Sequence, residues 1–224
     1  MSAIRGLTGL HALDIRDSDV KDLAPLAGLK RLQVLDLSGC TGVADLTPLA
    51  DLARLQMLHL GDCTGVTDLA PLAGLAQLQA LSLNGCTGVA NLAPLADLKR
   101  LQSLYLNGCT GVTNLAPLVG FTQLQQLEIN RCTGLADLAP LAGLAQLQAL
   151  SLNDCTGLAN LAPLARLVQL REVYLKDCTG VTDIDPLSGL GQMRMLCLDG
   201  CKGLSAEAVA AFRKSHPKTA IIDP

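Results

Sequence analysis

The motif Cys-Thr-Gly-Val, or a close variant of it, recurs eight times along the chain at a fixed spacing of 23 residues. The eight copies begin at Cys40, Cys63, Cys86, Cys109, Cys132, Cys155, Cys178 and Cys201. A period of about 20 to 50 residues is typical of a solenoid, in which each unit buries its apolar side only by stacking on its neighbours. The unbroken period predicts a single solenoid whose function resides on a surface rather than in a deep pocket.

Leucines hold fixed positions in each unit, in the order Leu32-x-x-Leu35-x-Leu37-x-x-Cys40. Because side chains two positions apart point to the same side of a strand, Leu35 and Leu37 are expected to face the interior and the residue between them to face away. The run matches the leucine-rich repeat consensus, with Cys at the position that accepts Asn or Cys. The chain therefore resembles the leucine-rich repeat superfamily over nearly its whole length.

The second half of each unit, Asp45-Leu46-x-Pro48-Leu49, is similar to that of the short-repeat subclass that includes internalins and phosphatase-regulator-type proteins. This resemblance implies an α/β-type repeat solenoid with a parallel sheet on its concave side, used for protein binding and not for catalysis. Proline and the short return predict turns and short 3₁₀ pieces on the convex side rather than long helices. Because Pro48 has no N–H, the Asp45 side chain is expected to cap the N–H of Thr47 instead.

Glycine follows each Cys-Thr pair, as Gly42 does in the unit of Cys40. Gly42 and its equivalents are expected to adopt a positive φ or to allow a close approach by the next coil. In the first unit, Ser18 stands where the later units have cysteine, and the turn is one residue shorter. The Thr-Gly pair is therefore interpreted as a one-residue enlargement of the turn.

The two ends of the chain depart from the repeat. Residues 1–6 are interpreted as a partial repeat, residues 7–204 as a solenoid of about nine rungs, and residues 205–224 as a C-terminal cap. In the cap, Ser205 is the expected N-cap of a helix, and residues 219–222 form a final strand. The N-terminal edge has no evident cap. Three interpretations stay open for it: an excerpt of a longer protein, an edge covered by a partner or by self-association, and a tolerated half-rung.

Charge and motifs exclude several functions. The net charge is −3, and the 17 basic residues are scattered without forming a stripe, which argues against nucleic acid or an anionic membrane as a partner. The chain begins without the apolar segment of a signal peptide and contains no apolar run of membrane-spanning length. It also lacks a phosphate-binding loop, a zinc-protease motif and a nucleophile elbow. We therefore expect no enzyme activity, no cofactor and a cytoplasmic location.

Nine cysteines in such a chain point to a reducing compartment. The eight cysteines of the repeats should stack one above another at the strand spacing of about 4.8 Å. Metal binding and disulfide formation are the alternatives, but parallel thiols in an apolar wall favour buried, protonated groups that donate weakly to loop carbonyls. Cys197 differs because it lies between Leu196 and Leu198, where it should face the concave side. An exposed, reactive thiol is one interpretation of that position.

The residues that the core leaves free form columns on the concave sheet, and variation among the repeats is concentrated there. Tyr105 and Tyr174 are the largest of these side chains, and Tyr is enriched at binding hot spots. The predicted site for a protein partner comprises His59, Tyr105, Glu128, Arg131, Glu172, Tyr174, Lys176 and Cys197. The alternative is that these residues only solvate the surface. A further column, from Asn84 to Asn153, is interpreted as a structural ladder of amides.

The residues thus predict a non-catalytic scaffold that binds a protein partner on its concave face. The alternative is a recognition or sensor domain of a larger protein, such as a bacterial effector ligase or an immune-type ATPase. A recent duplication is also evident, because residues 69–96 and 138–165 are identical except at Gly85/Asp154 and Val89/Leu158. Such expansion suits a recognition surface, although neutral drift or a consensus-style design would produce it too.

Overall fold

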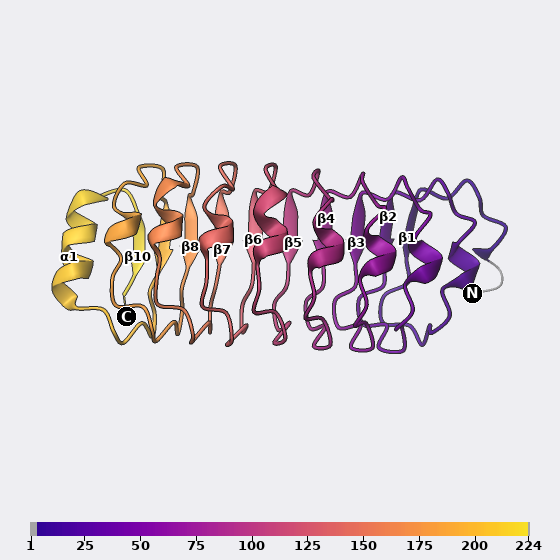
Figure 1. Cartoon of the computed structure of the whole chain (residues 1–224), viewed down its shortest axis with the longest axis horizontal. Helices are drawn as coiled ribbons and strands as arrows, with labels where there is room; N and C mark the ends of the chain where they lie inside the picture. The colour runs from indigo at the N-terminus through magenta and orange to yellow at the C-terminus, as the bar shows by residue number, and fades with distance from the viewer. Residues whose placement is uncertain (1–3, 224) are drawn as a thin grey trace.

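Each of the first eight coils starts with a three-residue strand and returns through a short 3₁₀ helix, as the computed structural model shows for residues 4–223 (Figure 1). Ten parallel strands form one sheet in sequence order. They are β1 (Ala12–Asp14), β2 (Val34–Asp36), β3 (Met57–His59), β4 (Ala80–Ser82), β5 (Ser103–Tyr105), β6 (Gln126–Glu128), β7 (Ala149–Ser151), β8 (Glu172–Tyr174), β9 (Met195–Cys197) and β10 (Ala220–Ile222). The predicted parallel-sheet solenoid is confirmed.

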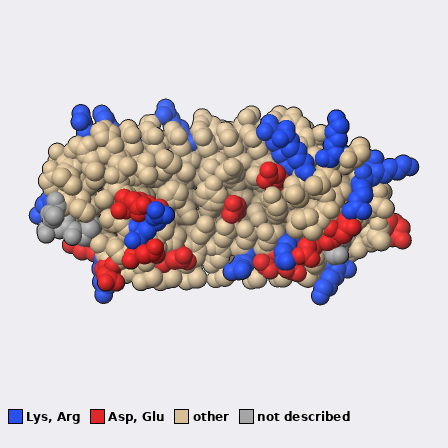
Figure 2. Space-filling model, turned by 180° about the vertical axis from the view of Figure 1, so that it is seen from behind, with Lys and Arg blue, Asp and Glu red and all other residues tan. Residues whose placement is uncertain are grey.

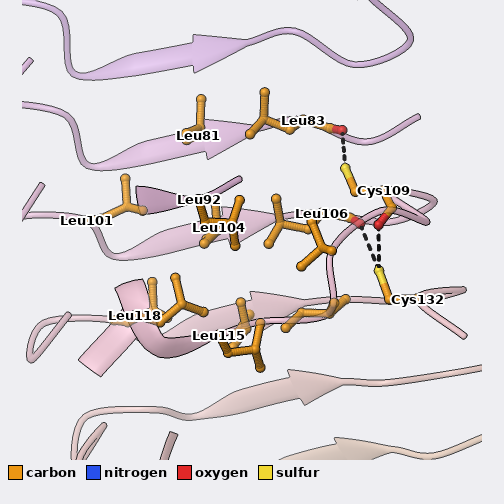
Figure 3. Packing of buried hydrophobic residues seen from close by; sticks show 14 of the residues in the cluster. Leu81, Leu83, Leu92, Leu101, Leu104, Leu106, Cys109, Leu115, Leu118 and Cys132 are labelled. Carbon is orange, nitrogen blue, oxygen red and sulfur yellow. Dashed lines mark hydrogen bonds between the residues drawn. The ribbon is translucent and has the colours of Figure 1, made fainter. Parts of the chain in front are cut away.

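The strand register places equivalent residues of successive units side by side. Leu58 of β3, for example, pairs with Leu81 of β4, and Leu81 pairs with Leu104 of β5. These central leucines are fully buried, and so are the leucines that follow each strand, such as Leu83. Figure 3 shows how they stack into one aliphatic column between the sheet and the return segments. Burying a leucine contributes roughly 1.5–3 kcal/mol, so the column as a whole is the main source of stability.

Opposite the sheet, the part of the chain that the structure describes in full contains eight 3₁₀ helices with Pro near the start of each. They are η2 (Ala24–Leu26), η3 (Thr47–Leu49), η4 (Ala70–Leu72), η5 (Ala93–Leu95), η6 (Ala116–Gly120), η7 (Ala139–Leu141), η8 (Ala162–Arg166) and η9 (Asp185–Leu187). The predicted cap is present, because the N–H of Thr47 donates to Asp45 Oδ1 at 2.8 Å. The same bond recurs in each of these coils, with Asn91 or another Asx residue as the acceptor.

The repeat cysteines form the predicted ladder of free, buried thiols. In most rungs the thiol donates to a strand-end carbonyl of the preceding coil, as Cys109 Sγ does to Leu83 O at 3.1 Å (Figure 3). Cys132 instead lies closest to the carbonyl of Cys109, at 3.3 Å. Burial raises the pKa of Cys109 to about 12. The interpretation as buried thiols that donate to carbonyls is therefore confirmed, and their low reactivity stays a prediction.

The turn after each strand differs in part from the prediction. Positive φ angles occur not at Gly42 and its equivalents but at the residue before each motif cysteine, for example 74° at Gly108 and 63° at Arg131. The motif glycines are instead needed because the preceding coil packs closely against them. A Cβ at Gly65 would lie 2.8 Å from the carbonyl oxygen of Val43.

The C-terminal segment adds a helix and the tenth strand to the solenoid. The helix α1 (Ala206–Ser215) begins at Ser205, whose Oγ accepts a hydrogen bond from the N–H of Ala208 at 3.1 Å. The strand β10 pairs in parallel with β9 and is one residue shorter than predicted. No helix within residues 4–223 is long and apolar enough to cross a membrane. The division into residues 1–6, 7–204 and 205–224 stays a prediction, and residues 1–3 and 224 lie outside the described part of the chain.

Candidate functional site

The structure places the eight predicted site residues at two levels of the concave side. Six of them stand on strands, in the columns that face away from the leucine core: His59, Tyr105, Glu128, Glu172, Tyr174 and Cys197. Arg131 and Lys176 lie beyond the strand ends, in the following turns. Because every strand contributes one residue to each column, the backbone distance between two residues of the same column follows from the number of rungs that separate them.

Three of the predicted residues surround one hollow in the sheet surface. Glu128 of β6 lines one side, and Glu172 and Tyr174 of β8 line the other. The strand between them, β7, contributes the small residues Ala149 and Ser151. The hollow has a volume of about 370 Å³. We call it the acidic hollow and define it by Gln126, Glu128, Ala149, Ser151, Glu172 and Tyr174.

Tyr174 is held in place and kept neutral by its surroundings. Its hydroxyl donates to Glu172 Oε2 at 3.2 Å. Burial raises the pKa of the Tyr174 phenol, and the negative charge of Glu172, with a smaller contribution from Glu128, adds to the effect. The phenol is therefore a neutral donor next to two carboxylates.

Tyr105 is linked to the same region through a glutamine. Its hydroxyl donates to Gln126 Oε1 at 2.7 Å, and Gln126 itself lines the acidic hollow. Tyr105 and Tyr174 lie three strands apart, which is about 14 Å at the spacing of a sheet. His59 is a further two strands from Tyr105, with β4 between them. The strand residues of the predicted site thus form one continuous region over β5 to β9, with His59 apart from it.

The two basic residues of the predicted site pair with acidic neighbours in the turns. Lys176 Nζ lies 2.6 Å from Asp199 Oδ2, and this hydrogen bond is the main cause that raises the pKa of the lysine. Arg131 Nε lies 3.8 Å from Asp154 Oδ2. Both basic side chains therefore face the edge of the sheet and not the acidic hollow.

The asparagine column has a structural role, but its bonds differ from the expected ladder of amides. The side-chain carbonyl of Asn84 accepts from the backbone N–H of Asn107 at 2.9 Å, and Asn107 does the same for Asn130 at 3.0 Å. The column thus satisfies backbone donors where the strands end. The Asn107 amide also donates to Glu128 Oε2 at 2.7 Å, which orients the carboxylate of Glu128.

The interpretation of Cys197 as an exposed thiol is wrong. Its position on the concave side is as predicted, but the residue is only 7% exposed. Tyr174 of β8 and Ile222 of β10 flank it on the two adjacent strands. These large neighbours cover the small thiol, so Cys197 is not available as a reactive group.

Sequence reasoning did not include Gln126, Ala149 and Ser151 in the site. These residues are small or neutral, and they carry no chemical signal of their own. The signal that could have found them is the register, which places Ala149 and Ser151 between the larger residues of β6 and β8. A pair of small residues between bulky, charged ones produces a depression in a sheet.

Charges are segregated across this face of the molecule. Figure 2 shows most acidic side chains gathered toward one long edge, with several basic side chains among them, and basic side chains dominating the opposite edge. The acidic edge is where the strands end, with residues such as Asp62, Asp177 and Asp199 in the turns, whereas arginines such as Arg31 and Arg54 precede the strands. Few charged residues lie in the middle of the face. Within residues 4–223, no three His, Cys, Asp or Glu side chains converge as metal ligands would.

Comparisons with known proteins agree on the fold. No protein-family model and no curated protein matches the sequence. Among solved structures, internalin C2 of Listeria monocytogenes is 33% identical, with 84% of this chain and 80% of that chain covered and a TM-score of 0.75. The leucine-rich repeat domain of the type III effector XopL is 25% identical, with 95% and 76% covered and a TM-score of 0.76. The functional domain of InlJ from Listeria monocytogenes, described as including a cysteine ladder, is 17% identical. The match covers 98% of this chain and 54% of that chain, with a TM-score of 0.58.

Proposed function

Because the chain belongs to the leucine-rich repeat superfamily, we propose that it is a non-catalytic scaffold that binds a protein partner on its concave face. Relatives with this fold are typically interaction domains, which supports protein binding in general. One observation supports the concave face in particular. Tyr105, Glu128, Glu172 and Tyr174 gather over β5 to β8, around the small outward residues of β7.

The size of this region suits a protein surface. Ten strands at about 4.8 Å make a sheet roughly 43 Å across, and three-residue strands are about 10 Å long. A standard interface covers about 800 Å² per partner, so a partner on this sheet would also touch the adjoining turns. Arg131 and Lys176 lie in those turns and would contribute to specificity through charge, together with the acidic edge around them.

Tyr105 and Tyr174 are the expected anchors of the interface. Once affinity capture on the immobilised chain has identified a partner, the Tyr105→Ala/Tyr174→Ala double variant should lose at least about 2 kcal/mol of binding free energy. A matched control removes two exposed valines away from the sheet, in Val119→Ala/Val168→Ala. Isothermal titration should find the control unchanged. Equal affinity of the tyrosine variant and the parent would move the interface to another surface.

A second candidate function is that of a recognition domain within a larger protein, such as a bacterial effector ligase or an immune-type ATPase. The likeness to the leucine-rich repeat domain of the effector XopL favours this candidate. A partner that is neither nucleic acid nor membrane remains part of the proposal on the strength of the net charge of −3. A cytoplasmic location remains part of it because nine free cysteines suit a reducing compartment. So does self-association through the edge of β1, where Leu7 is 51% exposed. Sedimentation velocity over a range of concentrations tests this last point.

A further inference from the structure

We propose that the acidic hollow over β6 to β8 receives the guanidinium group of an arginine from the protein partner. This inference deepens the proposed function and rests on it, because it names the chemistry by which the concave face would recognise a partner. Three properties of the acidic hollow carry the proposal: its shape, its uncompensated charge and the contrast with a second copy of its central strand.

The shape of the acidic hollow leaves room for a planar group between two walls. The strands β6 and β8 are separated by β7, so their backbones lie about 10 Å apart. Ala149 and Ser151 of β7 are short, and they leave the space between Glu128 and the Glu172/Tyr174 pair unfilled. The volume of about 370 Å³ lies in the range of side-chain and ligand pockets.

The charge of the acidic hollow has no compensation within residues 4–223. Glu128 Oε2 accepts from the neutral Asn107 amide, and Glu172 Oε2 accepts from the neutral Tyr174 hydroxyl. No basic side chain of the described chain lies within ion-pair distance of either glutamate, whereas Arg131 and Lys176 nearby are both paired with aspartates. Two oriented carboxylates therefore face the hollow with their net charge intact.

Arginine fits these walls better than other cations do. Its guanidinium is planar, donates to carboxylates in a fixed fork and stacks on aromatic rings, so Glu128, Glu172 and Tyr174 each offer it a matching contact. A divalent metal ion would need more ligands than two carboxylates, and no third His, Cys, Asp or Glu among the described residues completes such a group. Lysine carries a compact charge that cannot form the same fork.

An internal control is provided by β4, whose sequence Ala80-Leu81-Ser82 is identical to that of β7. Its neighbours are different. His59 and Tyr105 flank Ser82, and Ser82 is only 8% exposed, whereas Ser151 is half-buried. The serine of this small strand is thus covered at β4, whereas at β7 it borders the acidic hollow. An arginine should therefore bind at β7 and not at β4.

The test uses a minimal probe on the intact chain. N-acetyl-arginine N-methylamide is titrated at low salt into the isotope-labelled protein, and the amide signals are followed by NMR. Saturable shifts are expected for residues of β6 to β8 and not for residues of β3 to β5. N-acetyl-citrulline N-methylamide has the same shape without the charge, and it should shift these signals at least tenfold less at equal concentration. The lysine analogue should bind more weakly than the arginine probe.

Variants then assign the effect to the two carboxylates. Glu128→Gln/Glu172→Gln should weaken the arginine probe at least tenfold, while circular dichroism stays unchanged. Equal response to citrulline, shifts spread over β3 to β5, or an unaltered affinity of the glutamine variant would each overturn the proposal.

The two proposals can fail separately. If partner binding depends on Tyr105 and Tyr174 but the arginine probe does not bind, the arginine site is wrong and the concave interface stands. If the probe binds at β6 to β8 but the tyrosine variant keeps its full affinity for the partner, the acidic hollow binds guanidinium groups, but the proposed interface, and with it the role of the hollow in holding the partner, is wrong.

Discussion

Residues 69–96 and 138–165 are two nearly identical pieces of the same solenoid, and they present different surfaces. Each piece contains a strand of the sequence Ala-Leu-Ser, β4 in the first and β7 in the second, and the central leucines Leu81 and Leu150 are equally buried. The surface above β4 is closed by His59 and Tyr105, whereas the surface above β7 opens into the acidic hollow. The sequence of a coil therefore determines its own interior, and the coils on either side determine what its concave surface can bind.

The largest expected effect concerns the buried cysteine ladder that the two copies share. Alkaline pH should destabilise this interior in both copies at once. Burial raises the pKa of Cys86 to about 12 and that of Cys155 to about 11. An unfolded cysteine ionises near pH 8.5, so between pH 8.5 and 11–12 the folded chain holds more protons than the unfolded chain. Stability from the ladder is complete below pH 8.5 and is lost as the pH rises through this window. The folded state should disappear within it.

Thiolate absorbance at 240 nm and circular dichroism, recorded together during an alkaline titration, measure this effect. The thiolates should appear with the loss of structure. Thiolate signal that precedes unfolding, or rapid alkylation of Cys86 or Cys155 in the native protein at pH 8, would show that the two interiors are accessible.

The second prediction compares the buried leucines of the two copies directly. Leu81→Ala and Leu150→Ala should each lower the free energy of unfolding by about 2–5 kcal/mol, because each leaves a cavity in the aliphatic column. The two costs should be similar, because both side chains are fully buried in the same column, with Leu58 and Leu104 beside Leu81 and with Leu127 and Val173 beside Leu150. Urea unfolding checks this, with Tyr105→Ala and Tyr174→Ala as outward-facing controls that cost far less. A tyrosine variant that costs more than its leucine counterpart would mean that the sides of the strands are reversed.

Most of the fold was predictable because a repeat fixes the environment of each position. Once Leu35 and Leu37 face inward in one unit, their equivalents face inward in every unit. The spacing of Asp45 from Pro48 likewise determined that the cap would reach the N–H of Thr47, as it does at 2.8 Å. The stack of cysteines followed from the same argument.

Features that depend on two or three neighbouring coils were not predictable in this way. Cys197 faces the concave side as expected, but its burial results from Tyr174 and Ile222 on the adjacent strands. The acidic hollow also arises between coils, because Ala149 and Ser151 are unremarkable until β6 and β8 are placed beside them. The same applies to the turn, where the positive φ occurs at Gly39 rather than at Gly42. The N–H of Gly39 donates to the carbonyl oxygen of Gly61 in the next coil, at 2.7 Å.

The third prediction uses one of the two positions at which the copies differ. Gly85 and Asp154 occupy the same place before the motif cysteine, with φ angles of 70° and 60°. An L-residue pays roughly 1–2 kcal/mol in this left-handed region. Gly85→Asp should therefore destabilise the chain by at least about 1–2 kcal/mol, and the new side chain would also clash with the carboxylate of Asp62. Urea unfolding at neutral pH measures the change, and a neutral result would mean that the turn relaxes to accept the aspartate.

The smallest effect is expected from the reverse change, Asp154→Gly, which should stabilise the protein by about 0.5–1 kcal/mol because glycine adopts the left-handed region without strain. The substitution also removes the ion pair between Asp154 and Arg131, whose atoms are 3.8 Å apart with side chains 44% and 77% exposed. Such an exposed pair contributes roughly 0–1 kcal/mol and is weakened further by salt. The gain should therefore increase when urea unfolding is repeated at 1 M NaCl.

Arg131→Gln is the control, because it removes the same ion pair and leaves the backbone strain of Asp154 in place. If Asp154→Gly and Arg131→Gln destabilise the chain equally, the charge of Asp154 determines the difference between the two copies at this position, and the backbone does not.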